Sequence, residues 1–218
     1  MTSYLGGSGS ASGVLGSYVA AQGGASAASQ SATALKGSAR RLGGFLASAA
    51  QGFEEALQER GLGDVIGQSF DVIISALVDW IAGPGDSHED IISRVVVADI
   101  LVDLYEEAEF DSGLWDTISR DRITEEVLQI ALLKLVEKWI VEDVWRRGGD
   151  RAEMKNLNSQ ELRAKQTEFE DYVSQEVVFN FGEHGAIDLA TADWDSEEVR
   201  SIIDGVVQTS LVILGAAG

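Results

Sequence analysis

The sequence predicts an all-α fold, in which a helical domain of five or six helices follows a flexible N-terminal tail. Apolar residues recur at helical spacing in several long stretches, and no run of useful length alternates between apolar and polar residues as a half-buried strand would. Glycines lie at positions typical of helix ends. We therefore expect a flexible Gly/Ser/Ala-rich tail at residues 1–38 and an acidic all-helical domain at residues 39–218.

The tail differs from the rest of the chain in composition. None of the 36 acidic side chains lies before Glu54, and Gly, Ala and Ser are frequent as far as Ser38. Residues 1–13 offer almost no apolar area to offset the entropy cost of ordering the backbone, so we expect them to be disordered. For residues 14–35 a marginal helix, broken at Gly23-Gly24, stays an open alternative.

The first firm helix is expected to begin near Arg40 and to end at Gly61. Its apolar positions at helical spacing are Leu42, Phe45, Leu46, Ala49, Phe53 and Leu57. The following segment, Gly61–Gly67, is expected to be a structured turn. Its apolar residues Leu62, Val65 and Ile66 are predicted to pack closely on the core.

Two helices are predicted on either side of Gly83-Pro84-Gly85. Ser69 is expected to cap the first, which runs to about Ala82. Its predicted buried face consists of Val72, Ile73, Ala76, Leu77 and Trp80. Asp86 or Ser87 is expected to cap the second, which runs to about Ala108. One stripe of that helix consists of Ile91, Val95, Ala98, Val102 and Tyr105, and another of Asp99, Asp103 and Glu106.

The most apolar helix is expected from Thr124 to about Trp145, after a short connection at residues 111–121. Apolar residues cover more than half of its circumference, which is typical of a central helix. Arg146-Arg147, followed by Gly148-Gly149, is interpreted as a basic helix end, with phosphate contact as the alternative. A helix from about Ser159 to Phe179 follows. The last helix is predicted after a capping box formed by Asp195 and Glu198.

The charge of the chain limits its partners. The formal net charge is −20, and because the first 53 residues carry only basic side chains, the remainder carries −23. A domain with this charge should avoid nucleic acid and anionic lipid and should favour basic partners. No cysteine is present, so disulfides and thiolate metal sites are excluded. No apolar run approaches the ~20 residues of a membrane span, and we expect a cytoplasmic protein.

No catalytic constellation is visible, so we expect a protein that is not an enzyme and that needs no cofactor. The two histidines, His88 and His184, are isolated, and neither a serine elbow nor an HExxH pattern occurs. The stripe of Asp99, Asp103 and Glu106 leaves a metal-dependent helical enzyme as an alternative. A solvated acidic face is preferred, because no histidine accompanies the stripe at the spacing that helical di-metal sites use.

Three short phrases of the sequence resemble the QatB family. They are Thr2-Ser3-Tyr4-Leu5-Gly6-Gly7, Arg40-Arg41-Leu42-Gly43-Gly44 and Gly61-Leu62-Gly63-Asp64-Val65-Ile66-Gly67, the last followed by acidic helices. QatB is the small component of the four-gene bacterial Qat anti-phage defence system. Its neighbours are an ATPase, an enzyme similar to the 7-cyano-7-deazaguanine synthase QueC, and a TatD-like nuclease. The resemblance implies a partner and protein substrate of the QueC-like enzyme.

That enzyme would attach a deazaguanine-type base to an amine of the tail. An N-terminal α-amine, with a pKa of about 7.7–8.0, is a better nucleophile at neutral pH than a lysine at about 10.4. Modification or processing is therefore expected at Thr2, Gly6 or Gly7. Removal of Met1 would expose the amine of Thr2, whereas a glycine amine requires proteolysis, for which Gly6-Gly7 is the expected place.

The same segment carries the residues expected to bind the partner. Ser3, Tyr4 and Leu5 give the tail an aromatic and apolar handle. The alternative function is an acidic helical adaptor that assembles a multi-protein complex with no tail chemistry. Both functions predict protein partners and neither predicts direct binding to nucleic acid.

Overall fold

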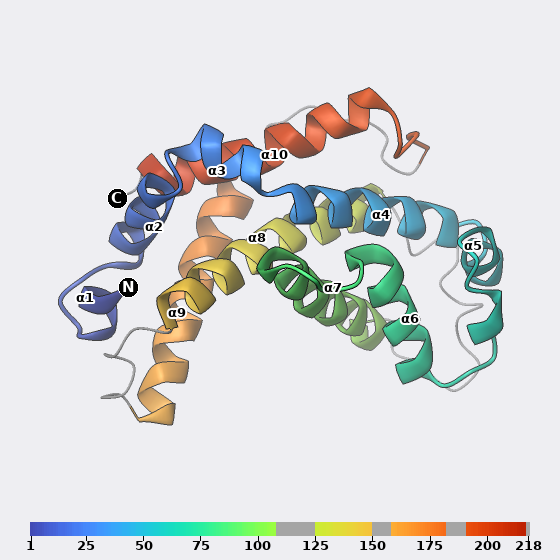
Figure 1. Cartoon of the computed structure of the whole chain (residues 1–218), viewed down its shortest axis with the longest axis horizontal. Coiled ribbons are helices and arrows are strands. Elements are labelled where there is room, and N and C mark those ends of the chain that lie inside the picture. Colours follow the sequence, from blue (N-terminus) through green and yellow to red (C-terminus); the bar gives the residue numbers. More distant parts are fainter. Residues whose placement is uncertain (108–124, 150–157, 182–190, 217–218) are drawn as a thin grey trace. The chain divides into compact units, whose positions relative to one another are not determined.

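The computed structural model describes residues 1–107, 125–149, 158–181 and 191–216, and over these ranges it contains only helices, turns and connections (Figure 1). The predicted all-α class is confirmed, although the described ranges hold ten α-helices where five or six were expected. The helices are α1 (Thr2–Leu5), α2 (Ala11–Ala21), α3 (Ala25–Ser31), α4 (Thr33–Ala49), α5 (Phe53–Glu59), a short 3-10 helix η1 (Gly63–Val65), α6 (Phe70–Ala82), α7 (His88–Glu107), α8 (Glu125–Gly149), α9 (Ser159–Phe181) and α10 (Glu197–Ala216). Within those ranges, no helix combines the length and the apolar character that crossing a membrane requires.

The chain forms two compact units, each built from separate parts of the sequence. The first unit consists of residues 1–33, 136–184 and 204–218, and the second of residues 34–135 and 185–203. The first unit therefore contains α1 to α3, α9 and the C-terminal parts of α8 and α10. The second contains α4 to α7 and the N-terminal parts of α8 and α10.

The N-terminal segment differs from the flexible tail that the sequence predicts. Tyr4 in α1 is 1% exposed and Leu15 in α2 is 0% exposed, so side chains from both helices lie in the core of the first unit. α2 and α3 are separated at Gly23-Gly24, where both glycines have left-handed φ values of 88° and 96°. The expected break is thus confirmed, whereas the expected disorder of residues 1–13 is not what the structure shows.

The N-terminal segment packs into the core because a few apolar side chains are placed on one face among many small residues. Val14, Leu15, Tyr18 and Val19 recur about one turn apart along α2 and are all buried. Small residues let the backbones approach closely: a Cβ atom placed on Gly215 of α10 would lie 3.0 Å from Cγ1 of Val19. The mean composition of the segment therefore understates the area that it buries.

In the second unit, the predicted single helix is divided into α4 and α5 near Gly52. The six apolar positions predicted for its buried face are all buried, which confirms the periodicity. Gly43 of α4 lies directly against Trp194, and a Cβ atom at this position would overlap the indole ring. Trp194 is 8% exposed, so glycine at position 43 is what allows the segment before α10 to pack on α4.

α6 and α7 pack against each other as a helical hairpin (Figure 1). Arg94 of α7 donates a hydrogen bond to the carbonyl oxygen of Gly83 and forms an ion pair with Asp79, so one side chain joins α6 to the connection that follows it. Ser87 caps α7, as expected: its hydroxyl accepts from the backbone N–H of Asp90, and the Asp90 carboxylate accepts from the N–H of Ser87, both at 3.0 Å.

The buried faces of these two helices agree only in part with those predicted: Ile73 and Leu77 of α6 are buried as expected, but other predicted positions are not. Val72 is 44% exposed, and the buried positions of α6 are Ile73, Ile74, Leu77, Val78, Ile81 and Ala82. Ile91 and Val95 of α7 are 42% and 37% exposed, and the buried apolar positions are Ile92, Val96, Val97, Ile100 and Leu101. Both helices carry apolar residues on more than one stripe, so periodicity alone did not identify the inward face.

The other sequence predictions have mixed outcomes. Trp139 and Ile140 of α8 are 3% and 1% exposed, in agreement with a buried helix. The predicted structured turn after Gly61 is confirmed, since it contains η1, and its residues Leu62, Val65 and Ile66 are half-buried. Ser196 caps α10, in place of the predicted Asp195–Glu198 box: its hydroxyl accepts from the N–H of Val199 at 3.2 Å. Thr124, His184 and the connection at residues 111–121 lie outside the described residues.

Gly43→Ala is expected to destabilise the chain by about 1–3 kcal/mol, because the added methyl group must displace the Trp194 ring. Gly205→Ala is the matched control, since nothing lies within 4 Å of a Cβ atom at that position in α10. The control should be neutral or stabilising, because alanine favours a helix interior over glycine. Urea denaturation measures both variants, and equal midpoints for the two would contradict the close packing of Gly43.

Candidate functional site

The residues expected to be processed lie in the connection between α1 and α2. This α1–α2 connection, residues 6–10, is outside both helices and is exposed along its whole length. It folds back on α1: the N–H groups of Ser8 and Gly9 both donate to the carbonyl oxygen of Ser3 at 2.9 Å. Gly6 and Gly7 are therefore accessible from solvent, on a backbone that is held at both ends.

Two glycines of the connection are required by its geometry. Gly7 has a φ of +79°, which side chains other than glycine rarely adopt. At Gly9, a Cβ atom would lie 2.9 Å from the backbone nitrogen of Tyr4, so the chain can return past α1 only without a side chain there. Gly6 does not have a left-handed φ, which makes that position the better choice for substitution.

Tyr4 and Leu5 are buried within the first unit, at 1% and 4% exposure. The Tyr4 hydroxyl donates to the carbonyl oxygen of Lys165 in α9 at 2.9 Å, and its ring centroid lies 6.1 Å from that of Phe169. The Lys165 ammonium lies 4.7 Å from the Tyr4 ring centroid, within the range of a cation–π interaction. Burial, with a contribution from the nearby Glu168, raises the pKa of Tyr4 to about 12.

The six residues that the sequence predicted for the site are thus divided by the structure. Ser3, Gly6 and Gly7 are exposed, whereas the side chains of Tyr4 and Leu5 make their contacts inside the chain. The backbone of Thr2 belongs to α1, and its side chain is outside the described part. Binding of a partner through Tyr4 and Leu5 stays a prediction, and it would require α1 to leave this position.

A buried hydrogen-bonded group holds α2 in place. The Tyr18 hydroxyl donates to Oδ2 of Asp143 in α8 at 2.6 Å, and Nε of Arg147 lies 2.7 Å from the same oxygen. The Asp143 side chain is 0% exposed. Burial, together with the adjacent carboxylate, raises the pKa of Tyr18 far above its ordinary value. Sequence reasoning missed this group, although Asp143 stands out as an acidic residue next to the buried Val144.

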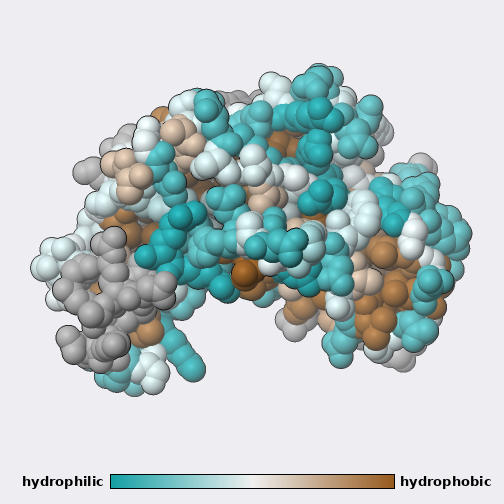
Figure 2. Space-filling model, in the orientation of Figure 1, coloured by the Kyte–Doolittle hydropathy of each residue, from teal (hydrophilic) through white to brown (hydrophobic). Residues whose placement is uncertain are grey.

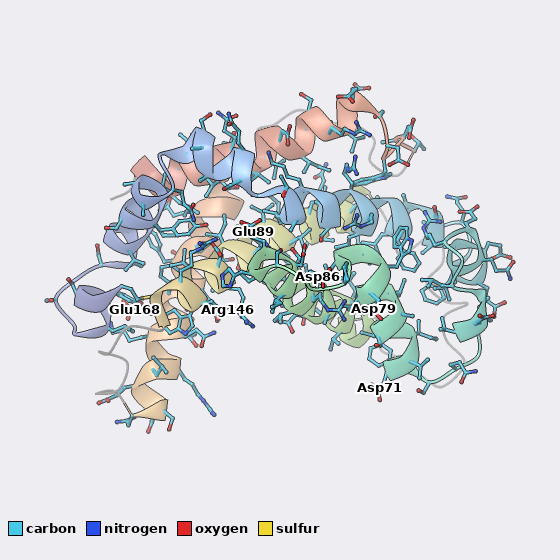
Figure 3. The ribbon with its side chains drawn as sticks, viewed as in Figure 1. Asp71, Asp79, Asp86, Glu89, Arg146 and Glu168 are labelled. Carbon is cyan, nitrogen blue, oxygen red and sulfur yellow. The ribbon has the colours of Figure 1, made fainter. Side chains whose placement is uncertain are left out.

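Within the part of the chain that the structure describes, the acidic side chains do not converge on a metal site. Over the described ranges, no group of three or more His, Asp or Glu side chains could hold a metal ion. Asp99 is exposed and Asp103 is half-buried, while the side chain of Glu106 is not described. Asp71, Asp79 and Asp86, which Figure 3 labels, are spread along α6 and the connection after it. The described residues therefore do not test the three-residue stripe of α7 as a metal site.

The basic cluster at the end of α8 pairs with acidic groups of its own helix. Arg146, labelled in Figure 3, lies 2.5 Å from Glu142, and Arg147 pairs with Asp143. Each pair spans one helical turn, an arrangement that stabilises helices by a few tenths of a kcal/mol. These contacts agree with the interpretation of the cluster as a basic helix end.

Comparison with known proteins identifies one family. The family model described as Qat anti-phage system associated protein QatB matches residues 23–214, which is most of the chain. The match begins after α2, so the α1–α2 connection lies outside it. Neither the curated proteins nor the solved structures contain a match to this sequence.

Tyr18→Phe is expected to destabilise the chain by about 1–3 kcal/mol, because the buried Asp143 carboxylate loses a hydrogen-bond donor while the ring is retained. Tyr172→Phe is the control, since this tyrosine is half-buried and its hydroxyl interacts with the Ser12 side chain. Urea denaturation at neutral pH measures both. A midpoint for Tyr18→Phe that equals the wild-type midpoint would show that the hydroxyl contributes nothing.

The stability of the chain is expected to fall as the pH rises above about 10. The folded pKa of Tyr4 is raised to about 12, so in that interval the unfolded chain loses its phenolic proton while the folded chain retains it. Below the unfolded pKa the contribution is constant. Tyr4→Phe should therefore make the decline in urea midpoint between pH 10 and about 12 shallower. An unchanged slope would contradict the burial of the Tyr4 hydroxyl.

Proposed function

Because the chain belongs to the QatB family of Qat anti-phage system proteins, we propose that it is a non-catalytic component whose N-terminal segment is the substrate of a QueC-like partner enzyme. The observation that carries the proposal is the exposed α1–α2 connection with its Gly6-Gly7 pair. An ATPase and a TatD-like nuclease of the same system are further partners of the proposed complex.

The proposed reaction joins a carboxylated deazaguanine-type base to an amine of this chain. The partner first activates the carboxylate with ATP: a carboxylate oxygen bonds to the α-phosphorus, pyrophosphate leaves, and an acyl-adenylate forms. The amine nitrogen then forms a bond to the carbonyl carbon, the bond from that carbon to the adenylate oxygen breaks, AMP leaves and the amine loses a proton. This chain supplies only the nucleophile, which agrees with the lack of a catalytic constellation in its sequence.

The geometry favours a glycine amine over that of Thr2. Thr2 begins α1, and the buried side chains of Tyr4 and Leu5 hold that helix against the first unit. Hydrolysis of the Gly6–Gly7 peptide bond by a protease would instead leave a carboxylate on Gly6 and place a new amine on Gly7, in the exposed connection and three residues before Ser10. Glycine at that position can enter a narrow pocket without steric cost.

The rest of the first unit would hold the new amine in a defined position. Ser10 caps α2 by accepting from the N–H of Gly13 at 3.1 Å, and Tyr18 fixes the same helix to Asp143. The product of cleavage would therefore be a short exposed end on an anchored helix. A partner that binds the folded body would find the amine at a reproducible distance.

An acidic adaptor with no tail chemistry is the alternative function. It is favoured by the net charge of −20 and by the hydrophilic side chains that cover much of the face shown in Figure 2. Both functions involve a basic docking surface on the partner. They differ in whether the N-terminal segment changes covalently.

Co-expression with the QueC-like enzyme, followed by intact-mass measurement and N-terminal sequencing, is expected to show a chain that begins at Gly7 and carries the added base. Gly6→Val should strongly reduce the product, because a branched side chain next to the cleaved bond hinders entry into a narrow pocket. Position 6 lacks the left-handed φ of Gly7, so this variant should fold normally.

The controls separate substrate failure from loss of folding. Circular dichroism and the Tm of Gly6→Val should equal those of the wild type, and chain expressed without the partner should carry no base. If the added base is found on the amine of Thr2, the acceptor residue is Thr2 and not Gly7, and the N-terminal segment is still the substrate. An unmodified chain in a complex that is active against phage would reject it in favour of the adaptor.

A further inference from the structure

The second unit contains a pocket in which three arginines gather. Its volume is about 520 Å³, within the range of small-molecule sites, and Arg40, Arg41 and Arg60 line it together with Trp80 and Trp194. The whole chain has 16 basic and 36 acidic side chains, so three arginines at one concave place are a strong local departure from its composition.

Arg60 is held rigidly in this pocket. One terminal nitrogen, Nη2, donates to the carbonyl oxygen of Gly44 and to the Ser48 hydroxyl, at 2.8 and 2.6 Å, and the other, Nη1, forms an ion pair with the Glu59 carboxylate at 2.8 Å. Its guanidinium carbon lies 5.6 Å from the ring centroid of Trp80 and 5.9 Å from that of Phe45. Its Nε atom is buried and has no hydrogen-bond partner. Arg60 thus has a fixed position beside aromatic rings, and its charge is paired with Glu59, but one buried N–H donor is unused, which costs free energy in the absence of a ligand.

Arg40 and Arg41 add positive charge that the pocket does not fully neutralise. Nε of Arg41 donates to the carbonyl oxygen of Ile81, which orients its guanidinium group. Burial, and secondarily the charge of Arg40, lowers the pKa of Arg41. Arg40 is half-buried and forms no ion pair among the residues whose placement is described. Asp193 and Asp195 also line the pocket, but neither forms an ion pair with Arg40 or Arg41 there.

The chemistry of the lining indicates the class of ligand. Guanidinium groups bind phosphate through paired hydrogen bonds, and the indole rings offer apolar contact to a planar ring. The carboxylates of Asp193 and Asp195 can accept hydrogen bonds from amino groups. We propose that this pocket binds a mononucleotide, with its phosphate on Arg40 and Arg41 and its base toward the tryptophans and the two aspartates.

The charge of the whole chain restricts the ligand to a small one. A net charge of −20 repels polyanions, and surface charges act over a Debye length of about 8 Å at physiological ionic strength. A nucleic acid or an acidic protein would place many negative charges near acidic helices outside the pocket. A mononucleotide places its few charges inside it, where the arginines are.

The inference is independent of the N-terminal chemistry. The pocket lies in the second unit and within residues 23–214, whereas the α1–α2 connection lies in the first unit and outside that range. It also gives a role to the Arg40-Arg41 pair, which the proposed reaction does not use. A failure of one proposal therefore leaves the other intact.

The test is titration of the full-length chain with AMP and GMP, followed by tryptophan fluorescence and calorimetry, with inorganic phosphate, adenosine and a short oligonucleotide as comparison ligands. At least one mononucleotide is expected to bind. Arg40→Gln should weaken that binding about tenfold or more, because a charge-assisted hydrogen bond is lost. Arg163→Gln, at an exposed position of α9, is the matched control and should bind as the wild type does.

A second variant checks that weaker binding does not result from a change in folding. Gln51 lines the pocket and its side chain is exposed, so Gln51→Glu adds a negative charge without disturbing the core, and it should also weaken binding. Binding of phosphate as tight as that of either mononucleotide would overturn the role of the rings. Tighter binding of the oligonucleotide would overturn the restriction to small ligands. No binding of AMP or GMP, or equal loss in Arg40→Gln and Arg163→Gln, would overturn the site.

Discussion

The packing of the first unit depends on the burial of one carboxylate. An ionised group removed from water is very costly unless it is paired and hydrogen-bonded, and Asp143 is completely buried. Its partners come from two helices, with Arg147 one turn later in α8 and Tyr18 in α2. α2 must therefore occupy one place against α8. The position of α2 in turn places the α1–α2 connection, which carries the candidate substrate residues.

A contrasting constraint shapes the second unit. Here a missing side chain, at Gly43, allows Trp194 to lie against α4, and the residues around Trp194 close one side of the arginine pocket. Arg40 and Arg41 precede Gly43 on the same helix, so one short stretch supplies both the charge and the space. Different interactions thus position the two candidate sites of this protein. A buried hydrogen-bonded charge positions the α1–α2 connection, and a close approach of the α4 backbone to the Trp194 ring shapes the arginine pocket.

The sequence predicted the helical class, the breaks at Gly23-Gly24 and Gly83 and the inward positions of α4 and α5, because these depend on local spacing and backbone freedom, but it missed the break near Gly52. It predicted Gly6 and Gly7 as candidate sites of processing or modification, and both residues are exposed to solvent in the structure. It did not predict that Val72, Ile91 and Val95 are exposed, because helices with several apolar stripes leave the choice of face to tertiary packing. Pairings between distant residues, such as Tyr18 with Asp143 or Gly43 with Trp194, have no local signal.

The exposed connection between two held segments has a mechanical consequence. α1 is only four residues long, and such a short helix has no stability of its own. It stays in place because the intact chain keeps its local concentration in the millimolar range typical of short tethers. A cut at Gly6-Gly7 would turn that tethered contact into an encounter between two molecules, so α1 would diffuse away. Phe169, which is 0% exposed, would then lose the cover of Tyr4, and cleavage at the surface would open an apolar patch on α9.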